Sequence, residues 1–127
     1  MNELGAVMIV DESAENFLQL TQRLSGAAPL WAPTTAVVRW WMRFLDKPVS
    51  AVMVRVAQVN DAAEARLIEA RRETGALVVA LMDTEPSATE LTRLERMSVG
   101  LLVEPVAPVS QNEVPREWRQ LGAPSLA

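Results

Sequence analysis

Short apolar runs alternate with segments of helical character along the chain, and this alternation limits the possible folds more than any other feature. The runs lie at 6–10, 30–32, 51–56, 76–81 and 101–103. Each is short enough to be a strand rather than a helix. Two parallel strands need a long crossover connection, which a helix between them supplies. Strands that alternate with helices are therefore expected to be parallel. The predicted fold class is therefore α/β, a doubly wound, five-stranded parallel sheet with helices on both faces.

Capping residues and stop signals place the helices between these runs. The first helix is expected after Ser13, a good N-cap residue, and the second between Thr34 and Leu45. Two later helices begin with the spacing of a capping box, at 61–64 with Asp in the capping position and at 87–90 with Ser.

One domain accounts for the length of 127 residues, which is enough for a proper core but too short for two. We expect residues 1–122 to form this domain. Its last element is a short helix between Pro115 and Gly122, and residues 123–127 form a C-terminal tail.

The composition excludes several kinds of chemistry. The chain contains no Cys, His or Tyr, and Lys47 is its only lysine. Thiolate chemistry, metal sites that use His and triads built on His or Cys are therefore excluded. With neither a P-loop nor a G-x-G-x-x-G motif, the sequence gives no sign of nucleotide binding. We expect a protein that is not an enzyme and that holds neither a cofactor nor a metal.

Charge and hydropathy limit the classes of partner that the chain is expected to bind. The net charge of −4 argues against a broad basic face for nucleic acid or an anionic membrane. No apolar run approaches membrane-spanning length, and residues 1–5 lack the basic start of a secretory signal. These features predict a cytoplasmic protein whose partners are proteins, including a second copy of itself.

A charged residue ends the third apolar run. Arg55 follows the apolar residues 51–54, and a guanidinium in such a setting needs an acidic partner. Candidate partners follow two other runs, Asp11 and Glu12 after the first and Glu104 after the fifth. In parallel sheets the carboxyl ends of the strands share one edge, where ligands bind. The candidate cluster at this edge comprises Asp11, Glu12, Arg55, Met82, Asp83 and Glu104.

Simpler interpretations of the same residues stay open. The side chain of Arg55 would also reach solvent by extending past the end of its strand. Asp11 and Glu12 precede a helix, where negative charge is favoured even without a partner. Met82 is a typical core residue, because methionine fills irregular gaps.

From residue 6 to about residue 121, the order and spacing of the elements resemble the receiver domain of bacterial two-component response regulators. The resemblance rests on the acidic pair Asp11-Glu12, on the residue that ends the third strand, Arg55, and on Glu104-Pro105 after the fifth strand. It implies the flavodoxin-like strand order 2-1-3-4-5 and a signalling context.

The resemblance also shows where the sequence departs from the family. Arg55 stands at the family's phosphoacceptor aspartate, Met82 at its hydroxyl switch residue and Glu104 at its strand-5 lysine. A working receiver uses carboxylates to hold a divalent cation and a lysine to neutralise the acyl phosphate. The expected function is that of a pseudo-receiver, a non-phosphorylatable signalling domain that acts through protein–protein interaction. The alternative is a flavodoxin-like domain that binds a small ligand at the carboxyl ends of its strands.

The helix expected between Thr34 and Leu45 is apolar around most of its circumference, more than packing on a sheet requires. Its inward stripe is expected to centre on Val37, Trp41, Phe44 and Leu45. Trp40 and Met42 then flank that stripe, and Trp31 extends the apolar surface from the preceding strand. Exposed apolar area of this kind marks interaction sites, so these three residues are the predicted partner-binding surface. The alternative is that loops and the neighbouring strand cover both flanks.

Overall fold

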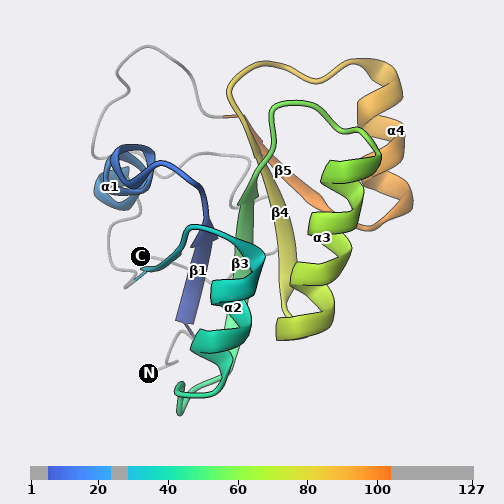
Figure 1. The fold of residues 1–127 in the computed structure, drawn as a ribbon. Helices are drawn as coiled ribbons and strands as arrows, with labels where there is room; N and C mark the ends of the chain where they lie inside the picture. Colours follow the sequence, from blue (N-terminus) through green and yellow to red (C-terminus); the bar gives the residue numbers. More distant parts are fainter. Residues whose placement is uncertain (1–5, 24–28, 104–127) are drawn as a thin grey trace, which may run out of the picture.

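The computed structural model describes residues 6–23 and 29–103 of the chain. Its centre is a five-stranded sheet in which every neighbouring pair is parallel and the strand order is β2-β1-β3-β4-β5 (Figure 1). The strands are β1 (Ala6–Val10), β2 (Pro29–Ala32), β3 (Val49–Arg55), β4 (Leu77–Met82) and β5 (Gly100–Val103). The predicted fold class, a doubly wound parallel α/β sheet of flavodoxin-like order, is confirmed.

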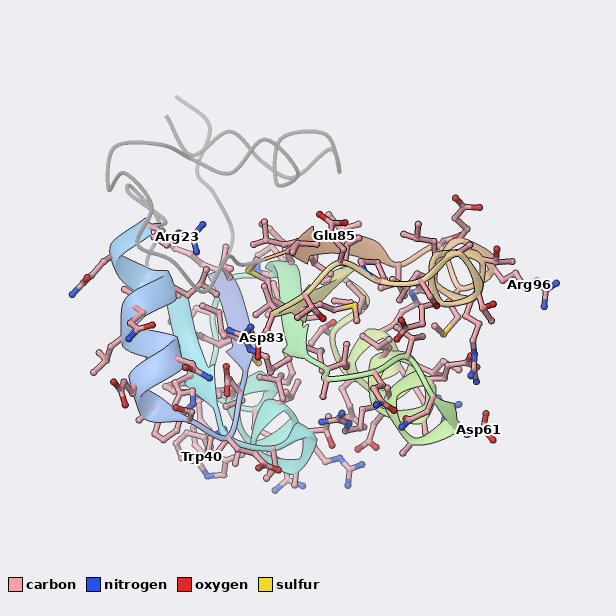
Figure 2. All side chains as sticks on the ribbon, turned by 90° about the horizontal axis from the view of Figure 1, so that it is seen from above. Arg23, Trp40, Asp61, Asp83, Glu85 and Arg96 are labelled. Atoms are coloured by element: carbon pink, nitrogen blue, oxygen red, sulfur yellow. The ribbon has the colours of Figure 1, made fainter. Side chains whose placement is uncertain are left out.

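Helices cover both faces of this sheet. The described helices are α1 (Ala14–Arg23), α2 (Thr35–Met42), α3 (Asp61–Thr74) and α4 (Ala88–Arg96). On one face Leu20 of α1 is fully buried with the sheet residues Ile9 and Met53. On the other face residues of α2, α3 and α4, among them Val38 and Leu94, pack against the sheet. Figure 2, which looks down on the molecule of Figure 1, shows α1 apart from α2 and α3.

Burial on both faces explains why the strands read as unbroken apolar runs. Successive side chains of a strand point to opposite faces. In β3, Ala51 and Met53 belong to the core beneath α1, whereas Val52 and Val54 belong to the core beneath the other helices. All four are fully buried. A strand with one solvent face would instead alternate between apolar and polar residues.

The caps of α1 and α4 follow the sequence signals, whereas that of α3 corrects one. The Ser13 hydroxyl accepts a 3.1 Å hydrogen bond from the Asn16 amide, and the Ser87 capping box is complete. The N-cap of α3, however, is Asn60 and not Asp61, because the Asn60 side chain accepts a 2.9 Å bond from the Ala63 amide. Asn caps helices as well as Asp does, so the sequence alone does not choose between these adjacent residues.

The inward face of α2 also differs from the prediction. The inward stripe consists of Val38, which is fully buried, and of Trp41, Met42 and Leu45, which are half-buried against the core, with Val37 beside it. These positions have the i, i+3, i+4, i+7 spacing of a packed helix face. Phe44, expected in the core, is 63% exposed. The amides of Phe44 and Leu45 both donate to the Trp41 carbonyl, at 2.9 and 3.1 Å, in the turn that follows the end of the helix at Met42.

Several expectations fall outside the described residues. These are the placement of Glu104, the short helix between Pro115 and Gly122, and the tail 123–127. Within 6–23 and 29–103, none of the helices has the length and apolar content needed to cross a membrane.

Candidate functional site: an arginine between two aspartates

Three charged side chains meet at the carboxyl edge of the sheet. The Nε atom of Arg55 lies 2.9 Å from Oδ2 of Asp11, which follows β1. The NH1 atom of the same guanidinium lies 2.6 Å from Oδ1 of Asp83, which follows β4. Figure 2 looks onto this edge and labels Asp83 near its centre. Arg55 therefore connects the ends of three strands through its side chain.

The parallel register explains how these residues come together. Because Met53 faces α1, strand alternation directs Arg55 to the same side of the sheet. Val10 is paired with Val54 and Arg55 with Leu81, so the residues just beyond β1 and β4 flank the end of β3. The Asp11 amide donates a 3.1 Å bond to the Ala32 carbonyl, which extends the β1–β2 ladder by one residue. This bond places Asp11 beside Arg55.

Burial differs sharply across the cluster. The side chain of Asp11 is 3% exposed, that of Arg55 is 14% exposed and that of Asp83 is 66% exposed. A carboxylate as buried as Asp11 is costly unless its charge and its oxygens are satisfied. Oδ2 is bonded by Arg55, and Oδ1 accepts a 2.9 Å bond from the Ser13 amide at the start of α1. Asp11 and Arg55 therefore form an internal ion pair, and Asp83 adds a contact at the surface.

Two other predicted cluster residues, Glu12 and Met82, belong to the described part of the chain, whereas Glu104 lies outside it. Glu12 is exposed, and the carboxylates that Arg55 contacts in the described part of the chain are Asp11 and Asp83. Met82 is 1% exposed and belongs to the core on the face opposite Arg55. Asp83 was predicted at this edge but not as a partner of Arg55. Because β4 lies beside β3, the residue just after β4 lies near Arg55. This position in the sequence could have identified Asp83 as a partner of Arg55.

An open cleft of about 430 Å³ adjoins the ion pair. It lies beyond the ends of β1, β2 and β3, where the strand order reverses and parallel α/β sheets bind ligands. The Thr34 side chain, at the N-cap of α2, makes no capping hydrogen bond. The residues that line the cleft are Val10, Asp11, Glu12, Ser13, Asn16, Pro33, Thr34, Thr35, Arg55, Ala57 and Arg66.

Comparisons of the chain with protein-family models, with curated proteins and with solved structures found no match. The described residues also contain no group of three or more Asp, Glu, His or Cys side chains placed to hold a metal ion.

The predicted partner-binding residues fall into two classes. Trp31 and Met42 are half-buried. The Trp31 indole donates a 2.7 Å bond to the Asp11 carbonyl and stacks on Phe17, and Met42 packs on the core. Trp40, by contrast, is 53% exposed and lies 4.8 Å from the ring of Phe44. The exposed aromatic surface is therefore formed by Trp40 and Phe44.

A second charged network, which was not predicted from the sequence, joins α4 to α3. Arg93 of α4 bonds Glu64 and also Asp61, the latter at 2.7 Å, and these hydrogen bonds raise the pKa of the Arg93 guanidinium. The Glu90 carboxylate accepts bonds from the amides of Ser87, at 2.9 Å, and Val59, at 2.8 Å. These two donors lower the pKa of Glu90. Spacing along one helix predicts the capping contact between Glu90 and Ser87. It does not reveal the contacts of Arg93 with α3 or of Glu90 with Val59, because those partners lie in other segments of the chain.

Proposed function

We propose that this chain is a receiver-like regulatory domain that works without phosphoryl transfer, through contact with a partner protein. The observation that carries the proposal is the Arg55 guanidinium bonded between Asp11 and Asp83 at the carboxyl edge of the sheet. The proposal includes a bacterial two-component or phosphorelay context, which comes from the family resemblance, and a cytoplasmic location, which is the expectation from the charge and hydropathy of the sequence.

The charge arrangement supports a regulatory role without chemistry. A carboxylate that accepts a phosphoryl group needs a nearby cation to neutralise the developing negative charge. Here the position at the end of β3 carries a fixed positive charge instead, and a guanidinium cannot form an acyl phosphate. Asp11, whose side chain is 3% exposed, already has both carboxylate oxygens bonded. The ion pair thus occupies the groups that a cation would otherwise bind.

Treatment with acetyl phosphate and Mg²⁺, followed by intact-mass measurement, tests this proposal. We expect no phosphoryl adduct on the wild-type chain, while a receiver domain with an acceptor aspartate, treated in parallel, serves as the positive control. A stoichiometric adduct that disappears in Asp11→Asn would contradict the proposal, because it would show a working phosphorylation site that depends on the acidic pair.

The cleft favours a second candidate function, the binding of a small polar ligand. Its volume of about 430 Å³ is within the range of small-molecule sites. Ser13, Asn16, Thr34 and the exposed Arg66 supply hydrogen-bonding groups around it. A thermal-shift screen with amino acids, nucleotides and carboxylic acids tests this candidate. A ligand of the cleft should raise Tm in proportion to its concentration, and Arg66→Ala should weaken that rise without lowering the Tm of the free protein.

A further inference from the structure

The outer surface of α2 presents two aromatic rings that are held in place from within. Trp40 and Phe44 are 53% and 63% exposed, and their ring centroids are 4.8 Å apart. The rings of Trp40 and Trp41 are nearly perpendicular, with their centroids 5.2 Å apart. Trp41 is fixed in turn, because its indole donates a 2.9 Å bond to the Trp31 carbonyl. The exposed pair therefore stands on an ordered support, which reduces the entropy lost when a partner binds.

Basic residues flank this aromatic pair along the chain. Arg39, Arg43 and Lys47 follow one another at intervals of four residues and are all exposed, whereas Asp46 is the only acidic residue between positions 39 and 47. Arg39 bonds Glu73 of α3 through Nε and NH2, at 3.2 and 3.1 Å, yet its side chain stays 60% exposed. Three positive residues, Arg39, Arg43 and Lys47, thus stand against two acidic ones, Asp46 and Glu73, a small positive excess on a chain whose net charge is −4.

We propose that this α2 surface, defined as Arg39, Trp40, Arg43 and Phe44, is the docking site for an acidic amphipathic segment of a partner protein. The inference rests on the proposed function, since it names the partner class of the regulatory domain. Apolar side chains of the segment cover Trp40 and Phe44, which are residues of the kind that anchor interfaces. Its carboxylates meet Arg43 and the exposed edge of Arg39, and arginine binds carboxylates in a two-pronged geometry.

Charge complementarity selects this occupant over a second copy or a membrane. In a symmetric dimer each patch meets its own equivalent, so Arg39 and Arg43 of the two copies would face one another. An anionic bilayer is an extended plane, and it would also bring the acidic Asp46 and Glu73 close to lipid phosphates. A peptide segment contacts the aromatic pair and its basic neighbours alone.

The test uses a synthetic helical peptide that carries Leu and Phe on one face and Glu on the other, with a twin in which Lys replaces every Glu. Binding to the full chain is measured by fluorescence anisotropy at low and high salt. We expect the acidic peptide to bind and the basic twin not to bind. Trp40→Ala with Phe44→Ala should weaken binding at least about tenfold. Arg43→Glu should also weaken it and should lower its salt dependence.

Leu18→Ala is the matched control, because Leu18 is 59% exposed on α1, over the opposite face of the sheet, and should leave binding unchanged. Urea denaturation establishes that each variant is folded. The proposal is overturned if the acidic peptide does not bind, or if Trp40→Ala with Phe44→Ala and Arg43→Glu both bind it normally.

Two further results would replace the proposed occupant. Concentration-dependent dimers in sedimentation, lost in the double variant, would assign the surface to a second copy. Binding to phosphatidylglycerol vesicles but not to the peptide would assign it to a membrane. Neither of these two results would change the expected outcome of the acetyl phosphate experiment, which tests the proposed function separately. Conversely, a phosphoryl adduct on the wild-type chain would refute the proposed function even if the peptide binds.

Discussion

Replacing Asp11 by alanine tests whether the internal ion pair stabilises the fold. The change leaves the Arg55 guanidinium, 14% exposed, without its buried partner, and it removes the acceptor of the Ser13 amide. Removing one member of a buried pair costs about 3–5 kcal/mol. Because Arg55 is partly exposed and keeps its contact with Asp83, we expect a loss near the lower end, about 3 kcal/mol.

Three further variants separate the contributions. Asp83→Ala should cost at most about 1 kcal/mol, because Asp83 is 66% exposed and solvent screens its attraction to Arg55. Asp11→Asn keeps an acceptor for the Ser13 amide but removes the charge, so it isolates the electrostatic part. Asp11→Leu combined with Arg55→Met removes both charges and should be more stable than Asp11→Ala alone, since apolar replacements of whole ion pairs are often tolerated.

Urea denaturation followed by tryptophan fluorescence gives the free energy of unfolding for each variant, provided that the m-values agree with that of the wild type. If Asp11→Ala lowers this free energy by less than about 1 kcal/mol, or if Asp83→Ala costs as much as Asp11→Ala, the pair is not the buried unit that the distances describe.

Two other predictions concern the helices. The pKa of Glu90 lies below its ordinary value of 4.5, so its stabilising contribution is complete above that pH and is lost as the pH falls through the folded-state pKa. The difference in unfolding free energy between wild type and Glu90→Gln, measured by urea titration, should therefore be largest above pH 4.5 and shrink on further acidification. A difference that does not change with pH would contradict this prediction. Gly75 ends α3 with φ of 66°, and an added Cβ would meet no atom within 4 Å. Gly75→Ala should cost about 1 kcal/mol from backbone strain alone. Gly75→Asn should cost less, because Asn tolerates the left-handed region. Equal losses of unfolding free energy in urea denaturation would refute this prediction.

Much of the fold was predictable because burial of a parallel sheet leaves a direct trace in the sequence. The unbroken apolar character of residues 51–54 follows from helices on both faces, and the Ser87–Glu90 spacing follows from two reciprocal hydrogen bonds. The pairing of Arg55 with Asp11 was predictable for a related reason. An arginine inside an apolar run needs an acid nearby, and carboxyl ends of parallel strands share an edge.

The remaining features depend on three-dimensional neighbours that the local sequence does not encode. Asp83 pairs with Arg55 because β4 lies beside β3, which is a property of sheet order. Phe44 is exposed because the helix stops at Met42 and its buried stripe centres on Val38. On a helix that is apolar nearly all round, periodicity does not fix which side faces inward. Of the three residues predicted for the partner-binding surface, Trp40 is exposed, whereas Trp31 and Met42 are half-buried and Phe44, expected in the core, is exposed instead.

The hydrogen bond from the Trp41 indole to the Trp31 carbonyl also affects how the sheet meets other chains. β2 is an edge strand, and its Ala32 carbonyl bonds the Asp11 amide on the β1 side. Alternation then turns the polar groups of positions 29 and 31 toward the open side. Position 29 is a proline without an N–H group, and the Trp31 carbonyl is already occupied by the indole. An extended segment of another molecule therefore finds few free backbone groups along this edge, so β-strand addition, a common route to aggregation and domain swapping, is disfavoured there.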